Sequence, residues 1–234
     1  MKKIAILLLI AFSFVFAQKT YVPDDKFEQA LIDLGYDTTL DDSVLTANIS
    51  GVIKLDVGDK SISDLTGIEA FVALEELRLW DNSLTSLDVT KNTGLKSLSL
   101  SRNKLTSLDV TKNTALKSLS VTSNRLTSLD VSKNTALKEL WCDFNQLTSL
   151  DVSKNTALTW LYCPSNKLTS LIMRNGATSQ LYKFDVTRNY SLNCIETLDP
   201  AYATANWTSA NGKIDAGVTF AYICGVDVDG VSTY

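Results

Sequence analysis

Leucines recur along the chain with a fixed spacing of 21 residues. The same spacing relates asparagines that follow each leucine pair. The leucine ladders begin at Leu74, Leu77, Leu84 and Leu87, and the asparagine ladder comprises Asn82, Asn103, Asn124, Asn145 and Asn166. Each unit reads L-x-x-L-x-[LVC]-x-x-N-x-L-T-S-L-D, and five consecutive units agree. A fixed period of this length indicates a repeat architecture in which each unit is one supersecondary element.

The polar and apolar positions within a unit predict a short strand. In L-x-x-L-x-L the fourth and sixth positions point inward, because side chains alternate along a strand. One coil cannot bury these leucines alone, so stacked coils are expected to pair their strands into a parallel sheet over a continuous core. A degenerate unit starts at Val52 and another at Leu181. We therefore expect about seven coils over residues 52–193.

The leucine spacing together with the asparagine at position nine resembles the leucine-rich repeat. The recurring "LTSLDVSKNTAL" and the 21-residue period are most similar to bacterial internalin-type repeats, including those with cysteine at the sixth position. The resemblance implies a mainly β repeat solenoid, a right-handed coil with its parallel sheet on the concave face. It also implies an N-terminal helical cap and a C-terminal cap.

Residues 18–51 are expected to form the N-terminal cap. In "PDDKFEQALIDLGYD", Asp24 or Asp25 can begin a helix, and Gly35 can end it. The predicted apolar face comprises Phe27, Ala30, Leu31 and Leu34. This helix would cover the apolar core at the open end of the solenoid.

Residues 194–234 are expected to form the C-terminal cap and tail, because the period stops after Leu192. The segment resembles the cap that follows such repeats in exported bacterial proteins. Four cysteines allow three complete disulfide pairings. Cys194 and Cys224 bracket the segment, so a disulfide between them is the preferred pairing.

Cys142 and Cys163 occupy the sixth position of neighbouring units. They are expected to be buried free thiols that behave as small apolar side chains. A disulfide between them is the first alternative, but parallel neighbours in register fit disulfide geometry poorly. A zinc site is the second, but it needs about four ligands and no histidine or further cysteine is in register.

Residues 1–17 have the features of a secretory signal peptide. Lys2 and Lys3 precede an apolar run over residues 4–16, and small Ala17 follows. The run is too short for an ordinary membrane-spanning helix. We expect a secreted or cell-surface protein that does not insert into the membrane after signal cleavage.

The composition argues against several functional classes. The net charge is −4 with scattered charges, which is a poor basis for nucleic-acid binding. The sequence contains no histidine, so the commonest general base and metal ligand is missing. "DVDG" at 227–230 lacks the later ligands of a calcium loop. We predict no enzyme activity, no metal and no cofactor, and we make no prediction of oligomeric state.

Outward positions three, five and seven of the strand change character along the chain. The units that start at Leu95 and Leu116 carry serine and threonine there. The next two units carry the candidate ligand-binding residues Glu139, Trp141, Asp143, Phe144, Trp160 and Tyr162, with Trp80 further along the same face. Exposed aromatic patches mark interaction surfaces. The alternatives are that aromatic residues simply favour strands or that Phe144 tucks under the turn.

The leading functional hypothesis is an exported recognition protein that binds a protein ligand through the concave sheet face. The internalin resemblance suggests a role in adhesion. The first alternative is a carbohydrate-binding surface, in which Trp141, Trp160 and Tyr162 stack on sugar rings. The second is a structural spacer without a dedicated ligand.

Overall fold

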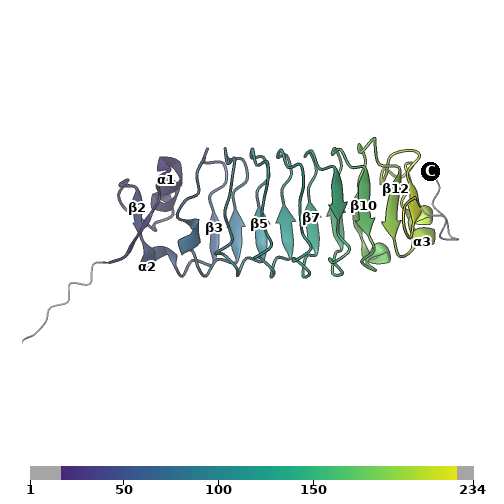
Figure 1. Ribbon diagram of the computed structural model, residues 1–234. Helices are drawn as coiled ribbons and strands as arrows, with labels where there is room; N and C mark the ends of the chain where they lie inside the picture. The colour runs from purple at the N-terminus through teal and green to yellow at the C-terminus, as the bar shows by residue number, and fades with distance from the viewer. Residues whose placement is uncertain (1–16, 226–234) are drawn as a thin grey trace, which may run out of the picture.

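The computed structural model describes residues 17–225. The signal peptide expected over residues 1–17 therefore falls almost wholly outside the described residues, and so does the "DVDG" sequence. Figure 1 shows one elongated stack of coils, with the first helices at one end and the last helix at the other. The longest helix of the described chain has nine residues, and no helix in this part is long and apolar enough to cross a bilayer.

A parallel sheet of seven strands runs along one face of the stack. Each strand comes from one coil, and neighbouring strands pair in exact repeat register, so that Leu77, Leu98 and Leu119 lie side by side. The strands are β3 (Lys54–Asp56), β4 (Glu76–Arg78), β5 (Ser97–Ser99), β6 (Ser118–Ser120), β7 (Glu139–Trp141), β9 (Trp160–Tyr162) and β11 (Lys183–Asp185). The predicted coil, period and parallel sheet are confirmed.

A second parallel sheet of four strands forms on another side of the last coils. Its strands are β8 (Ser149–Asp151), β10 (Ser170–Met173), β12 (Cys194–Thr197) and β13 (Thr219–Ala221). β12 pairs with β10 and β13 pairs with β12, and Val186 N donates to Lys213 O (2.9 Å). The winding thus continues for about one irregular turn after the leucine period stops.

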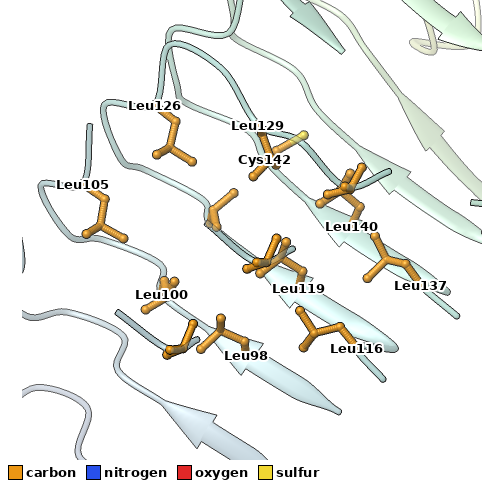
Figure 2. Close-up of a cluster of buried hydrophobic side chains, with 14 of the residues drawn as sticks. Leu98, Leu100, Leu105, Leu116, Leu119, Leu126, Leu129, Leu137, Leu140 and Cys142 are labelled. Atoms are coloured by element: carbon orange, nitrogen blue, oxygen red, sulfur yellow. The ribbon is translucent and has the colours of Figure 1, made fainter. Parts of the chain in front are cut away.

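The repeated leucines fill the space inside the coils. In Figure 2 the leucines of successive coils, such as Leu98, Leu119 and Leu140, point into the same interior and stack one behind another. All three are buried. Full burial of such a side chain contributes roughly 1.5–3 kcal/mol relative to exposure, and the contribution exists only where a neighbouring coil covers it.

Two asparagine ladders satisfy the backbone at the turns. The first is the predicted position-nine ladder. The Oδ1 atom of Asn103 accepts from Leu84 N (3.0 Å), and its Nδ2 donates to Leu79 O (2.8 Å) and Leu100 O (3.1 Å). Each of these side chains therefore joins its own coil to the preceding one.

The second ladder lies in the "KNT" turn and was not recognised in the sequence. It comprises Asn92, Asn113, Asn134 and Asn155, all with no exposed surface. Asn134 Nδ2 donates to Val110 O (3.0 Å) and Asn113 O (2.9 Å). The 21-residue spacing of these asparagines was the signal that could have identified it.

Each coil leaves the main sheet through a residue in the left-handed backbone region. This residue is position eight of the repeat, directly before the position-nine asparagine. The φ angles are 55° at Asp81, 58° at Arg102, 55° at Ser123, 51° at Phe144, 57° at Ser165 and 59° at Arg188. None of these residues is glycine, so each coil carries some backbone strain at this turn.

The N-terminal segment packs against the first coils. It contains β1 (Lys19–Tyr21), α1 (Asp25–Asp33), β2 (Ser43–Leu45) and α2 (Thr46–Ile49), and a short 3-10 helix, η1 (Ile68–Ala70), follows β3. Asp24 is the N-cap of α1 and accepts from Phe27 N (3.0 Å), while its other oxygen accepts from Ser63 N (2.8 Å). Phe27 lies 6.3 Å from the Phe71 ring. The helix is thereby fixed to the solenoid.

One detail of the predicted helix is wrong. Leu34 was assigned to the apolar face, but it is 47% exposed. It is the C-cap residue, one position beyond the end of α1, so it leaves the helical periodicity that buries Phe27, Ala30 and Leu31.

At the C-terminal end, α3 (Pro200–Asn206) follows β12, and a 3-10 helix, η2 (Thr178–Gln180), precedes β11. Trp207 directly follows α3, and its buried ring stacks on Phe184 at a centroid distance of 4.0 Å. Cys194 and Cys224 form the predicted disulfide. The bond joins β12 to the residues that follow β13.

Candidate functional site

The outward face of the main sheet has three zones of different chemistry. In the first zone, on β3 and β4, opposite charges pair with each other. Arg78 contacts Glu76 (2.6 Å) and Asp56 (3.6 Å), and Lys54 contacts Glu76 (3.2 Å). These partly exposed pairs contribute little to stability, and they leave little net charge for a partner.

The second zone, on and beyond β5 and β6, carries small hydroxyl side chains at positions three, five and seven. They are Ser97, Ser99, Ser101, Ser118, Ser120 and Thr122. Ser101 Oγ and Ser120 Oγ share a hydrogen bond of 2.7 Å. Because these side chains are short, they project less far from the sheet than the aromatic side chains on β7 and β9.

The third zone holds the aromatic cluster, which we define as Trp141, Trp160, Tyr162 and Tyr182. The Trp141 and Trp160 rings lie 5.4 Å apart at 45°, and the Trp160 and Tyr182 rings lie 5.3 Å apart at 78°. Tyr162 is the register partner of Trp141 on the next strand. Rings from three successive coils thus form one continuous, partly exposed surface.

The structure places the predicted aromatic residues together on the outward face. Trp141, Trp160 and Tyr162 are each half-buried, and Glu139 is the register partner of Trp160. Tyr182 was missed by sequence reasoning, although it is 63% exposed. It occupies position two of the last unit, where the preceding units carry lysine, glutamate or threonine, and this contrast was the available signal.

Trp80 lies apart from the cluster. β5 and β6 separate its coil from that of Trp141, which at about 4.8 Å per strand is roughly 14 Å. Its ring covers Gly58, where an added Cβ would lie 2.3 Å from Trp80 Cε2. It is 40% exposed, and the packing over Gly58 gives it a structural role of its own.

Asp143 is only 5% exposed. Its carboxylate accepts a hydrogen bond of 2.6 Å from Thr122 Oγ1 on the preceding coil. Burial raises the pKa of this carboxyl, and the negative charge of Asp185 raises it further, against the lowering effect of the Thr122 bond. Little of the Asp143 carboxylate is therefore open to a ligand.

Phe144 projects from the surface and does not tuck under the turn, since it is 53% exposed. Together with Tyr162 it borders a pocket of about 210 Å³, which we call the Phe144–Tyr162 pocket. Its lining residues are Phe144, Tyr162, Pro164, Ser165, Asp185, Thr187 and Arg188. The pocket adjoins the aromatic cluster, because Tyr162 belongs to both.

Tyr162 sits in an environment of opposing charges. The Lys183 ammonium lies over its ring, 5.2 Å from the centroid. Burial raises the pKa of the Tyr162 phenol, as do the carboxylates of Asp185 and Asp143, while Arg188 has the opposite and smallest effect. The two carboxylates therefore outweigh the guanidinium at this position.

Cys142 and Cys163 are fully buried and not bonded to each other, as expected. Burial raises the pKa of the Cys142 thiol well above its usual range, and the neighbouring Cys163 thiol adds to the effect. Nucleophilic chemistry requires the thiolate, so these cysteines belong to the core.

One group of acidic residues in the described chain has oxygens close enough to share a metal ion, namely Glu28, Asp37 and Asp41. The Glu28 carboxylate already accepts from the backbone N–H groups of Asp41, Asp42 and Ser43 at 2.8–3.1 Å. Asp41 pairs with Lys19 at 2.9 Å. Glu28 has a structural role, because it holds the chain that leads into β2.

The stacked coils, the in-register parallel sheet and the position-nine asparagine ladder define a leucine-rich repeat solenoid. No family model matches the chain, and no curated protein sequence does so either. Similarity to solved structures is clear. The functional domain of InlJ from Listeria monocytogenes, which includes a cysteine ladder, is 35% identical, with a TM-score of 0.61 over 79% of this chain and 39% of that one.

Two further internalins from Listeria monocytogenes share the fold. Internalin C2 is 22% identical, with a TM-score of 0.63 over 89% of this chain and 100% of that one. The internalin inlF is 19% identical, with a TM-score of 0.60 over 86% of this chain and 68% of that one. The chain therefore has the leucine-rich repeat fold and is similar to these internalins.

Proposed function

We propose that this chain is an exported recognition protein that binds a protein ligand through the main sheet face, in an adhesion-type role. The observation that carries the proposal is the aromatic cluster. Its rings run continuously across three coils, while the rest of the face presents ion-paired side chains, small hydroxyl side chains and the single ring of Trp80. Solvent-exposed patches of this kind are typical of interaction sites.

The residue types of the cluster favour a protein partner. Tryptophan and tyrosine are enriched among the residues that dominate the energy of protein interfaces. They offer large contact areas, and holding them in place costs little entropy here because the rings already pack against each other. The similarity to internalins supports the same class of role, and a recognition role accounts for the site without catalytic chemistry.

A glycan-binding surface is the alternative from a different class. A sugar ring stacks best on a flat aromatic platform. The neighbouring rings of the cluster meet at 45° and 78°, so they do not form one plane. The tilt supports a partner with an irregular surface, such as a folded protein, over a carbohydrate chain.

The experiment compares the protein without residues 1–17 with its Trp141→Ala/Trp160→Ala/Tyr162→Ala variant. Both are tested against a glycan array and against extracts of cell-surface proteins. The matched control is Ser97→Ala/Ser99→Ala/Ser118→Ala, which changes the same sheet face in the hydroxyl zone. Thermal unfolding of all forms verifies that they remain folded.

We expect protein capture that the aromatic variant loses and the serine variant retains. Glycan binding lost in the aromatic variant would replace the proposal with the carbohydrate alternative. Equal protein capture by all three forms would refute the assignment of the site.

A further inference from the structure

The Phe144–Tyr162 pocket is the right size for one amino-acid side chain. Its volume is about 210 Å³. Pockets for small molecules and cofactors have volumes of ~300–1,000 Å³. A cavity of this size beside an aromatic patch is typical of the recesses that receive a single anchor residue at a protein interface.

The pocket has an aromatic wall that the fold does not require. Phe144 occupies position eight, where a left-handed backbone costs an L-residue roughly 1–2 kcal/mol. The corresponding residues of the adjacent coils are Ser123 and Ser165, so a small polar side chain suffices for the turn. A bulky residue in this conformation is an outlier, and strained residues concentrate at functional sites.

Charged groups of both signs border the pocket, and the Asp185 carboxylate is the one that can serve an incoming cation. Asp185 Oδ1 accepts from Thr187 N (3.0 Å) and Thr187 Oγ1 (2.8 Å), and Asp185 forms no ion pair within residues 17–225. Arg188 also lines the pocket, but its effect at the Tyr162 hydroxyl is smaller than that of Asp185 or Asp143. The two carboxylates therefore outweigh Arg188 at the Tyr162 hydroxyl.

The Tyr162 ring already interacts with a cation in this setting. The Lys183 ammonium lies 5.2 Å from its centroid, within the range of a cation–π contact. An arriving guanidinium would find a second aromatic ring, Phe144, and the free carboxylate oxygen of Asp185. Planar guanidinium groups stack on aromatic faces and bind carboxylates with directional hydrogen bonds.

We propose that the Phe144–Tyr162 pocket receives one cationic side chain, arginine or lysine, of the protein partner, with Asp185 as its counter-charge. This inference rests on the proposed function, because it names the chemistry of one anchor residue in the partner. It assigns Asp185 and Tyr162 to specificity, and Phe144 to the outer wall of the pocket.

The test uses small probes in place of the partner. The ¹⁵N-labelled protein is titrated with N-acetyl-arginine amide, N-acetyl-lysine amide, N-acetyl-citrulline amide and N-acetyl-glutamate amide, and backbone amide shifts are followed by NMR. Citrulline is the matched control, since it keeps the shape of arginine without its charge. We expect the arginine probe to shift the amides of Phe144, Ser165 and Thr187, with about tenfold weaker binding of citrulline.

The variant Asp185→Asn should lower the affinity for the arginine probe about tenfold. Asparagine can still accept from Thr187, so the turn is preserved. The control is Asp56→Asn, which changes position five of the first coil and should leave the titration unchanged. Tyr162→Leu should also weaken arginine binding.

Three outcomes would overturn the cation pocket. They are equal binding of citrulline and arginine, stronger binding of the glutamate probe, and an Asp185→Asn titration equal to wild type. These results would leave the proposed function intact if Trp141→Ala/Trp160→Ala/Tyr162→Ala still abolished protein capture. The capture experiment tests the proposed function, and the probe titration tests the cation pocket, so failure of one can be told from failure of the other.

Discussion

Asp143 and Phe144 follow the same strand, yet the first is buried and the second projects into solvent. Asp143 occupies position seven, where it lies against Thr122 of the preceding coil. Phe144 occupies position eight, where the positive φ angle of 51° redirects the chain. The turn geometry decides which of two adjacent residues a partner can contact.

Asp143 should affect the dependence of stability on pH. Its carboxyl pKa is raised by burial and by the charge of Asp185. A carboxyl with a raised pKa in the folded state stabilises the fold below its unfolded pKa, and this contribution is lost as the pH rises through the folded pKa. Asp143→Asn removes the buried charge, so it should raise the free energy of unfolding at neutral pH.

The gain from Asp143→Asn should shrink as the pH falls toward the ordinary carboxyl pKa of 3.8. Urea unfolding of wild type and variant at neutral pH and near that value measures both free energies. A variant that is less stable than wild type at neutral pH would show that the Thr122 hydrogen bond to a charged acceptor outweighs the cost of burial.

Phe144→Asn should separate stability from binding. Asparagine tolerates the left-handed conformation better than phenylalanine, so the free energy of unfolding should rise by about 1 kcal/mol. Capture of a protein ligand should weaken because the outer wall of the pocket is lost. Chemical denaturation measures the first effect, with Ser165→Asn as the control at the same turn of the next coil. A loss of stability would mean that Phe144 has a packing role.

For single residues, the sequence predicted which side chains share a face of the sheet better than it predicted which side chains touch. The register placed Trp141, Trp160 and Tyr162 on one face. It could not show that Trp80 packs over Gly58, because that contact depends on how far a ring reaches across the coil. It also missed Tyr182, which lies outside the alternating strand positions and reaches Trp160 through its long side chain.

At the scale of the elements, the strands and turns follow directly from the repeat. The seven strands of the main sheet could be predicted because leucines at positions four and six must face a common core. The second sheet could not be predicted from the repeat, because it continues into the irregular segment after Leu192. In that segment β12 and β13 are held by backbone pairing. No repeating side-chain pattern in the sequence marks these two strands.

The "KNT" ladder should contribute to stability like the predicted one. Asn134→Ala removes two buried hydrogen bonds to Val110 O and Asn113 O, so it should lower the free energy of unfolding by about 2 kcal/mol. Thr135→Ala, at the adjacent exposed position, is the control and should be close to neutral. Equal stability of both variants in urea unfolding would contradict a structural role for this ladder.

At the scale of the whole molecule, stability should be distributed along the stack, because each coil contacts only its neighbours. We propose that residues 18–51 and 194–225 act as caps. Trp207 covers Phe184 at one end, and Phe27 contacts Phe71 near the other. The sequence could predict that the ends need covering, but not which aromatic side chain would do so.

Cys194→Ser/Cys224→Ser should loosen the C-terminal end. The disulfide closes a separation of 30 residues, for which the chain-entropy model gives about 3.6 kcal/mol. Hydrogen exchange should accelerate in β12 and β13, while β5, β6 and β7 remain protected. Uniform acceleration in all strands would contradict the nearest-neighbour account and indicate one cooperative unit.

The most direct test of the central claim asks which face of the molecule a protein ligand touches. A photo-crosslinking residue, benzoylphenylalanine, is placed at Ser120, the register partner of Trp141. In a second protein it is placed at Ser107, an exposed residue that follows the turn by which its coil leaves the main sheet. Each protein is irradiated in an extract of cell-surface proteins, and the adducts are identified by mass spectrometry. Recognition through the main sheet face predicts a defined protein adduct from position 120 and none from position 107. Adducts of equal or greater yield from position 107 would contradict it.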